Sequence, residues 1–274
     1  MAEMVVTGLN IRLSAICLLC TALFFYTGQF SRALAAEPPG AEKVPVIVYH
    51  EVLPNPTGDS SNASIISLEQ FARQMNYLHD NGFYTASLAE LEGYVKSGRR
   101  LPPKTVVITF DDGYESNYLY CYPYLQRYNF RSVLFLMGSV PPNARQHLTG
   151  LQLMNMTRSG LVEIGSHTYG LHREIDGTPA LLAQSGQEIA GDFVMFNLLC
   201  SRAGINRPFA IAYPYGVAGS DALKASAGAG YRMGFTIEKG YVRTGDPLMG
   251  LKRFNIGPEV DIDSFAAIVS GTLQ

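Results

Sequence analysis

Hydrophobic positions along the chain form short continuous runs that alternate with longer repeats of helical period. Continuous apolar runs are typical of buried strands, whereas apolar residues three or four positions apart are typical of amphipathic helices. The runs predict strands at residues 44–49, 106–110, 132–137, 161–165, 209–213, 232–237 and 251–254. The helical repeats predict helices at residues 67–81, 87–97, 116–128, 179–202, 222–228 and 264–269.

The first two helices carry recognisable start and stop signals. Ser67 is followed by Gln70 and Ser87 by Glu90, which is the spacing of a capping box. A glycine, Gly98, follows the second helix at the position where left-handed backbone commonly ends a helix. These signals indicate where the helices begin and end.

Strands and helices alternate from residue 44 almost to the end of the chain. This order predicts an α/β fold with a mostly parallel sheet and crossover helices, and the number of units fits an incomplete or distorted barrel. Hydrophobic residues make up 47% of the chain and charged residues 16%, which suits a large buried core. We expect one domain over residues 44–274, preceded by a short linker at residues 37–43.

The first 36 residues are typical of a targeting segment. Arg12 precedes an apolar run of about 14 residues, Leu13 to Tyr26, and Ala33-Leu34-Ala35 gives a small-x-small cleavage pattern. The run is shorter than the roughly 20 residues that span a bilayer. We therefore expect a cleaved signal peptide and a secreted or extracytoplasmic protein. An uncleaved anchor that holds the protein on a membrane is the alternative.

The overall charge narrows the set of partners. The formal net charge is −2 and no block of like charge occurs, so nucleic acid is not an expected partner. A monomer is expected. Cys121 and Cys200 are the cysteines outside the targeting segment, and the sequence leaves open whether they form a disulfide or remain buried thiols.

Polar side chains with metal-binding or acid–base chemistry follow several predicted strands. His50 follows the first strand, Asp111-Asp112 a later one, and His167 another, with His172 five residues further on. The carboxyl ends of parallel strands converge on one face of a β/α fold, so we expect these side chains to meet. One carboxylate and two imidazoles are a common ligand set for a divalent transition metal.

Simpler interpretations exist for each of these residues taken alone. Asp111-Asp112-Gly113 also fits an ordinary turn, and a lone histidine is usually a hydrogen-bonded core or rim residue. The spacing of His167 and His172 does not place both on one helix face, but suits a loop that returns the second histidine over the first. Gly170 is expected to ease that bend. His79 and His147 are expected to be solvated surface residues.

This set of residues predicts hydrolysis of an amide or ester. A metal held by Asp112, His167 and His172 would polarise a carbonyl and lower the pKa of a bound water, which then attacks. Asp111 would take the proton of that water. The backbone N–H of Tyr215 would help to stabilise the tetrahedral oxyanion.

Three segments resemble a known family. They are Thr109-Phe-Asp-Asp-Gly-Tyr114, Ser166-His-Thr-x3-His172 and Tyr213-Pro-Tyr-Gly216, and they resemble the motifs of the polysaccharide deacetylase family, also called the NodB-homology domain or carbohydrate esterase family 4. Val48-Tyr-His-Glu51 and Leu251-Lys-Arg-Phe254 fit the same pattern.

The resemblance extends over about residues 44–270 and implies a distorted (β/α)7 barrel. It also implies metal-dependent removal of acetyl groups from N-acetylglucosamine polymers of a cell wall or exopolysaccharide, with zinc as the expected metal and cobalt or nickel as alternatives. By position in the motifs, the implied catalytic base is Asp111 and the implied metal ligands are Asp112, His167 and His172. The implied substrate-binding residues are Tyr114, Pro214, Tyr215 and Arg253, with Tyr215 also lending the oxyanion-hole amide.

The chain departs from the commonest family pattern in ways that affect the mechanism. The four-residue spacer between His167 and His172 resembles the subgroup of secreted poly-N-acetylglucosamine deacetylases, which share the Tyr49-His50 pair. The usual arginine before Tyr213 is missing, and no tryptophan and no histidine after His172 is present. The general acid is therefore either Asp111, once protonated, or His50. An O-acetyl esterase and a catalytically weak glycan-binding relative are the alternative functions.

Overall fold

The structure is a computed structural model that describes residues 40–56, 64–140 and 147–273. The predicted targeting segment at residues 1–36 lies outside the described residues, as do residues 37–39 of the predicted linker. Within the described ranges, no helix has both the length and the apolar character needed to cross a membrane. Residues from Pro39 onward form one compact unit.

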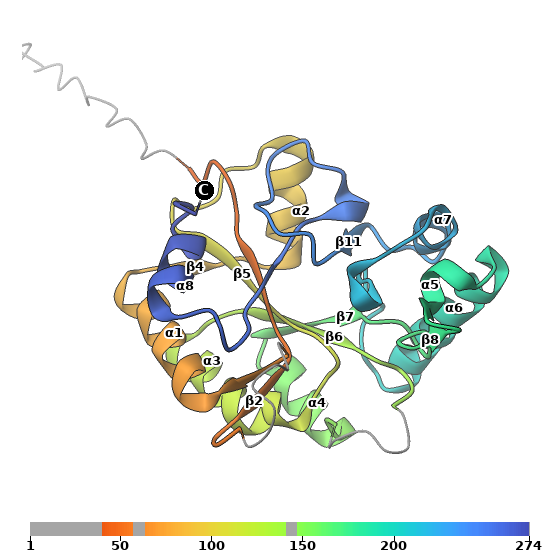
Figure 1. Cartoon of the computed structure of the whole chain (residues 1–274), viewed down its shortest axis with the longest axis horizontal. Coiled ribbons are helices and arrows are strands. Elements are labelled where there is room, and N and C mark those ends of the chain that lie inside the picture. The colour runs from red at the N-terminus through yellow and green to blue at the C-terminus, as the bar shows by residue number, and fades with distance from the viewer. Residues whose placement is uncertain (1–39, 57–63, 141–146, 274) are drawn as a thin grey trace, which may run out of the picture. The chain divides into compact units, whose positions relative to one another are not determined.

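A single parallel sheet of eight strands lies at the centre of this unit (Figure 1). Across the sheet the strands follow the order β11 (Met233–Phe235), β10 (Ala210–Ala212), β7 (Val162–Ser166), β6 (Ser132–Leu136), β5 (Thr105–Phe110), β1 (Val46–Tyr49) and β12 (Phe254–Asn255). The remaining strand, β4 (Tyr84–Thr85), pairs with the start of β5.

Residues 251–255 connect the two sides of the sheet, β11 and β1. Leu251 forms a parallel bridge with Phe235 of β11, and Phe254 of β12 pairs with Ile47 of β1. The sheet therefore curls into an incompletely closed barrel, which confirms the predicted α/β barrel fold. Arg253 lies in the middle of this closing segment.

The helices lie mostly in the connections between strands, as parallel pairing requires. They are α1 (Leu68–Asp80), α2 (Leu88–Ser97), a π-helical turn η1 (Asn117–Cys121) that leads into α3 (Tyr122–Tyr128), α4 (Gly150–Arg158), α5 (Ala180–Ala183), α6 (Gly186–Arg202), α7 (Ser220–Gly228) and α8 (Ile262–Val269). Short 3₁₀ turns are η2 (Pro214–Gly216) and η3 (Leu248–Gly250). Two small strand pairs lie outside the main sheet: β2 (Glu51–Leu53) with β3 (Ile65–Ser67), and β8 (Glu174–Ile175) with β9 (Thr178–Pro179).

Alternate residues of the strands enter two different hydrophobic clusters, because successive side chains of a strand point to opposite faces. In β5, Val107 packs with the interior of the curled sheet and α2. Ile108 and Phe110 pack on the outer face, in the cluster that includes Phe71 of α1 and Phe265 of α8. The interior series continues from Val107 through Thr109 to position 111, so the strand itself directs Asp111 into the mouth of the barrel.

Most predicted elements are present within two residues of their expected bounds, and the differences have local causes. The helix predicted at residues 179–202 is wrong as a single element, because Ser185 interrupts it and caps α6 in a capping box with Glu188. Helix α4 was not predicted, since Met156 is its one buried side chain. The predicted strand at 251–254 is reduced to the bridge at Leu251 and to β12.

The two cysteines outside the targeting segment do not pair. Cys121 and Cys200 are both buried and free. Burial raises the pKa of the Cys200 thiol to about 11 and raises the pKa of Cys121 further. Both thiols are therefore packing groups, the second of the two alternatives that the sequence left open.

Candidate metal centre and active site

The acidic pair lies where β5 ends. The backbone N–H of Asp111 donates to Tyr49 O at 2.9 Å and so continues the ladder with β1, while the N–H of Gly113 donates back to Asp111 O at 2.9 Å. This makes a three-residue turn around Asp112, whose φ of 70° is uncommon for a residue with a side chain. The turn separates the two carboxylates, so that each one has its own set of partners.

Asp112 converges with the two predicted histidine ligands. Asp112 Oδ1 lies 3.4 Å from His167 Nε2 and 3.4 Å from His172 Nε2. One ligand atom from each of the three residues lies within 4.8 Å of the others. Asp112 Oδ1 is buried and accepts no hydrogen bond from any described group. Three potential ligand atoms are therefore close enough together to bind one metal ion.

The tautomer of His167 fits metal binding. His167 Nδ1 lies 2.8 Å from Ala212 O, and since a carbonyl can only accept, Nδ1 carries the hydrogen. Burial lowers the pKa of this imidazole, against the opposing effect of Asp111 and Asp112, so the ring is neutral at neutral pH. Nε2 then presents a lone pair toward a carboxylate oxygen, an arrangement that a cation between them would stabilise. The donor set fits a divalent transition metal.

His172 returns over His167 as the spacing predicted. The two imidazole centroids are 4.9 Å apart, and the ring of His172 lies 4.9 Å from that of Tyr215. The expectation that Gly170 eases the bend is wrong, because the left-handed residue of the loop is Thr168, with φ of 71°. The bend is therefore made by a residue that also supplies a hydroxyl group.

Asp111 is held by a buried arginine. Arg253 donates from both terminal nitrogens to the two carboxylate oxygens, at 2.8 and 2.7 Å, and from Nε to Thr236 O at 2.9 Å. Asp111 is 2% exposed and Arg253 0%. Desolvation raises the pKa of Asp111, but the charge and hydrogen bonds of Arg253, assisted by the nearby His167 and His50, outweigh it and hold that pKa at about 2. Asp111 is therefore ionised and fixed in orientation.

The position of Arg253 differs from the role expected for it. A side chain with no exposed surface offers no contact to a polymer, and within the described residues its guanidinium donates hydrogen bonds to Asp111, Thr109 and Thr236. An arginine in a predicted buried strand indicates a buried partner for its charge, but the sequence does not identify Asp111 as that partner.

The other candidate residues surround the same mouth of the barrel. His50 follows β1 and is half-buried; its carbonyl accepts from Asn117 Nδ2 at 2.8 Å, and its Nδ1 is buried without a hydrogen-bond partner. Pro214 is buried, whereas Tyr215 is 39% exposed and adopts a φ of 58°. Tyr114 lies at the end of the acidic turn.

His147 was wrongly expected to be a solvated residue. It forms an antiparallel bridge with Tyr114, and the two rings lie 5.1 Å apart, so it belongs to the rim of the site. Sequence reasoning also missed Asp192 of α6, whose carboxylate binds the loop between the two histidines. No local pattern marks either residue, because each acquires its place through the packing of distant segments.

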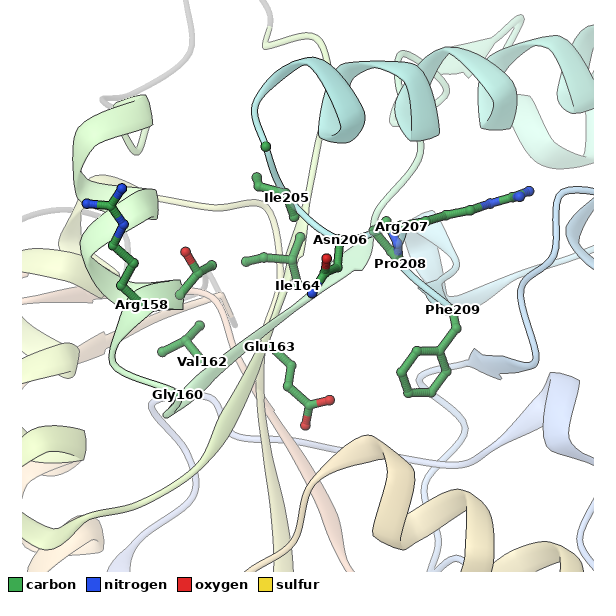
Figure 2. A pocket seen from close by; sticks show the side chains of 12 residues that line it. Arg158, Gly160, Val162, Glu163, Ile164, Ile205, Asn206, Arg207, Pro208 and Phe209 are labelled. Carbon is green, nitrogen blue, oxygen red and sulfur yellow. The ribbon is translucent and has the colours of Figure 1, made fainter.

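The cavity drawn in Figure 2 is a separate feature. It has a volume of about 450 Å³ and lies at the opposite end of β7, next to residues 204–209. Arg158 and Arg207 extend away from each other in this view, and Glu163 accepts a hydrogen bond from the N–H of Leu88. A smaller cavity of about 270 Å³ adjoins Asp112 and Gly113 and has mostly apolar walls.

The chain is similar to known proteins over most of its described length. The family model for polysaccharide deacetylase matches residues 98–234. The protein YxkH of Bacillus subtilis (strain 168) is 31% identical over 228 residues, which cover 83% of this chain and 76% of that protein. The poly-beta-1,6-N-acetyl-D-glucosamine N-deacetylase of Escherichia coli (strain K12) is 32% identical over 207 residues.

The alignment with the Escherichia coli protein covers 63% of this chain but 30% of that enzyme, so this chain spans less than a third of it. Among solved structures, IcaB from Ammonifex degensii superposes with a TM-score of 0.75 at 26% identity. That match covers 84% of this chain and 98% of the IcaB chain.

Proposed function

Because the chain belongs to the polysaccharide deacetylase family, we propose that it is a metal-dependent hydrolase that removes N-acetyl groups from a polysaccharide containing N-acetylglucosamine. The observation that carries this proposal is the convergence of Asp112, His167 and His172 beside a second, separately held carboxylate, that of Asp111. Similarity to enzymes named poly-beta-1,6-N-acetyl-D-glucosamine N-deacetylase supports this class of polymer.

In this proposal Asp112, His167 and His172 would hold the metal, with the Nε2 atoms of the two histidines as the available ring nitrogens. A bound divalent ion, zinc first and cobalt or nickel as alternatives, supplies Lewis-acid polarisation of the acetyl carbonyl and of water. The hydrogen bond from His167 Nδ1 to Ala212 O keeps the Nε2 lone pair directed at the ion.

Asp111 accepts the proton of the attacking water. A carboxylate whose pKa is about 2 is a weak base, so its contribution comes from position more than from proton affinity. Arg253 fixes the carboxylate plane and leaves the remaining lone pairs of the two oxygens for the water. We therefore assign Arg253 to the positioning of Asp111 and not to the binding of substrate.

His50 donates a proton to the leaving amine, and the backbone N–H of Tyr215 binds the developing oxyanion. His50 is close enough to Asp111 to lower its pKa, and its Nδ1 has no protein partner within the described structure. The left-handed turn at Tyr215 places its backbone at the rim, where its ring covers His172. Tyr114 and the exposed ring of Tyr215 are proposed to contact the sugar, whereas the buried Pro214 is proposed to shape the turn that carries Tyr215.

The glycine after Tyr215 has a steric reason to be a glycine. A Cβ at Gly216 would lie 2.2 Å from Ile237 Cγ1 and 2.7 Å from its backbone nitrogen, and the φ of Gly216 is +72°. Any larger residue would displace the turn that carries Tyr215. The glycine of the motif Tyr213-Pro-Tyr-Gly216 is thus explained by the geometry of this turn.

Acetate release tests the function. The full chain is treated with a chelator, reloaded with Zn²⁺, Co²⁺ or Ni²⁺, and assayed on chito-oligosaccharides, on poly-β-1,6-N-acetylglucosamine and on O-acetylated xylan. Acetate from the N-acetylated polymers that depends on metal and is lost in Asp112→Asn and His167→Ala, with circular dichroism unchanged, supports the proposal. Acetate from xylan alone favours the esterase, and glycan binding without acetate release favours the weak relative.

We further propose that residues 1–36 direct the domain out of the cytoplasm and are then removed. The apolar run at 13–26 and the Ala33-Leu34-Ala35 pattern support export. N-terminal sequencing of the exported protein tests this: a start near residue 37 supports cleavage, and an intact N-terminus that fractionates with membranes supports the anchor instead.

A further inference from the structure

The four residues between His167 and His172 have all their backbone N–H groups bound by side-chain oxygens. Thr168 N donates to Ser166 Oγ at 3.1 Å, and Leu171 N donates to Thr168 Oγ1 at 3.1 Å. The two N–H groups between them, those of Tyr169 and Gly170, donate to Asp192 Oδ1 and Oδ2, each at 2.7 Å. The path of this loop is therefore specified by three side chains, and the only one from outside the loop region is Asp192.

The shape of the loop favours an anion next to the backbone N–H groups of Tyr169 and Gly170. Thr168 has a left-handed φ of 71°, and successive N–H groups next to such a residue form a concavity that favours negative charge. An ionised carboxylate suits it because it only accepts hydrogen bonds, one oxygen for each N–H. On the other side of the loop, Thr168 O and Tyr169 O accept from Gly138 N at 3.0 Å and Ser139 N at 2.6 Å.

The two histidines depend on this loop to different degrees. His167 is fixed by its own hydrogen bond to Ala212 O and its side chain is 3% exposed. The side chain of His172 is 28% exposed, and within the described structure its ring makes tilted contacts with the rings of His167 and Tyr215 but no hydrogen bond that would orient it. The position of His172 Nε2, 3.4 Å from Asp112 Oδ1, is therefore set mainly by the backbone that carries it.

We propose that Asp192 is a positioning residue for His172: its carboxylate ties the loop to α6 and so holds the third ligand in place for the metal. Among the described residues, the hydrogen bonds of the Asp192 carboxylate go to the backbone N–H groups of Tyr169 and Gly170 and not to the metal ligands, so Asp192 acts through the loop backbone. This inference rests on the metal site proposed above and adds to it a residue from outside the family motifs.

Metal affinity of the full chain tests the role of Asp192. In Asp192→Asn, the amide group of the new side chain faces one of the two backbone N–H donors, so one hydrogen bond is replaced by a repulsive contact. We expect the affinity for Zn²⁺, measured by competition with a chromophoric chelator, to fall by about tenfold to hundredfold. The visible absorption spectrum of the Co²⁺-loaded protein is expected to change as well, because the geometry of the third ligand is altered.

The matched control is Glu188→Gln on the same helix. Glu188 is exposed and bonds to Ser185 in the capping box of α6, away from the loop, so its variant should bind Zn²⁺ like the wild type. Hydrogen exchange of the metal-free protein adds a second readout, in which Asp192→Asn should speed exchange at residues 169 and 170. If Asp192→Asn does not fold, Asp192→Ser takes its place, because serine brings no amide group against the backbone N–H donors. The same changes in Zn²⁺ affinity, Co²⁺ spectrum and hydrogen exchange are expected.

The results separate this inference from the proposed function. Wild type that binds Zn²⁺, together with a folded Asp192 variant that binds it equally tightly and gives the same Co²⁺ spectrum, would overturn the inference alone. Wild type that binds no Zn²⁺, Co²⁺ or Ni²⁺ would overturn the metal site and the role of Asp192 with it.

Discussion

Arg253 and Asp111, which are 142 positions apart in the chain, form a bidentate ion pair inside the mouth of the barrel. Both side chains are almost completely withdrawn from solvent. The arginine reaches this place because residues 251–255 close the sheet between β11 and β1. The segment that completes the fold therefore also holds the proposed catalytic base.

Replacing Arg253 with methionine should affect stability and activity together. Removing one partner of a buried ion pair leaves the other charge uncompensated, which costs about 3–5 kcal/mol. We expect a lower free energy of unfolding in urea and strongly reduced acetate release. The double variant Asp111→Asn/Arg253→Met should regain part of the stability without activity, since no charge remains buried.

The control for Arg253 is another arginine that binds a carboxylate at the surface. Arg232 pairs with Glu92 at 2.9 Å, but its side chain is 53% exposed. Pairs screened by solvent contribute at most about 1 kcal/mol, so Arg232→Gln should change stability little and activity not at all. Equal losses in Arg232→Gln and Arg253→Met would contradict the importance given to the buried pair.

Much of the site could be predicted from the sequence because it follows from local rules. Asp111, Asp112 and His167 come directly after strands, and the ends of parallel strands meet whatever the details of packing. The partners of Asp111 and of the histidine loop could not be predicted in this way. Arg253 depends on how the barrel closes, and Asp192 on how α6 packs against the loop, and neither relationship leaves a periodic signal in the sequence.

The fold shows the same division between local and distant causes. Capping boxes at Ser87 and Ser185 fix the first residues of α2 and α6. Each capping box joins residues only three positions apart, so its effect is local. At Ser67 the reciprocal bond is absent, since the side chain of Gln70 donates to Gly257 O and Val260 O instead. A distant contact therefore displaced a local one that the sequence pattern had predicted.

Adding Zn²⁺ should stabilise the wild type and not a variant that lacks a ligand. A ligand at a hundred times its dissociation constant stabilises the native state by about 2.7 kcal/mol. We expect Zn²⁺ to raise the melting temperature of the wild type and to leave that of His172→Ala unchanged. His79→Ala is the control, because His79 stacks on Tyr128 at the surface, and its melting temperature should rise with Zn²⁺ as in the wild type.

Glu163 provides a test of pH dependence far from the metal. Burial raises the pKa of this carboxyl above its ordinary 4.5, while the hydrogen bond from Leu88 N lowers it by less. The native state therefore binds this proton more tightly than the unfolded chain does. The contribution to stability is complete below pH 4.5 and is lost as the pH rises through the native pKa.

Glu163→Gln should remove the loss of stability that accompanies ionisation of Glu163. Glutamine keeps a carbonyl oxygen for Leu88 N but carries no charge, so at pH 7 the variant should be as stable as the wild type or slightly more stable. Glu163→Ala, which leaves the N–H of Leu88 without this acceptor, should be less stable at every pH. Urea unfolding at pH 4.5 and at pH 7 measures both effects, and a Glu163→Gln protein that is clearly weaker at pH 7 would contradict this account.

His50 distinguishes the two candidates for the general acid. An amine leaves only after it is protonated, whereas 4-nitrophenolate leaves without a proton. If His50 is the acid, His50→Ala should lose about 10²–10⁴-fold in N-deacetylation but much less in hydrolysis of 4-nitrophenyl acetate. Zinc affinity should be unchanged, because His50 is not among the three residues that converge on the metal position.

The contrary outcome has an equally definite meaning. If Asp111 returns the proton it has taken from the water, His50→Ala should deacetylate N-acetylated oligosaccharides nearly as fast as the wild type. The low pKa of Asp111 argues in part for this route, since a strongly acidic carboxyl gives up a proton readily. The same low value means that Asp111 is rarely protonated, and His50 is near enough to influence the same carboxylate. The ratio of the two substrate activities in one variant therefore decides between the two acids.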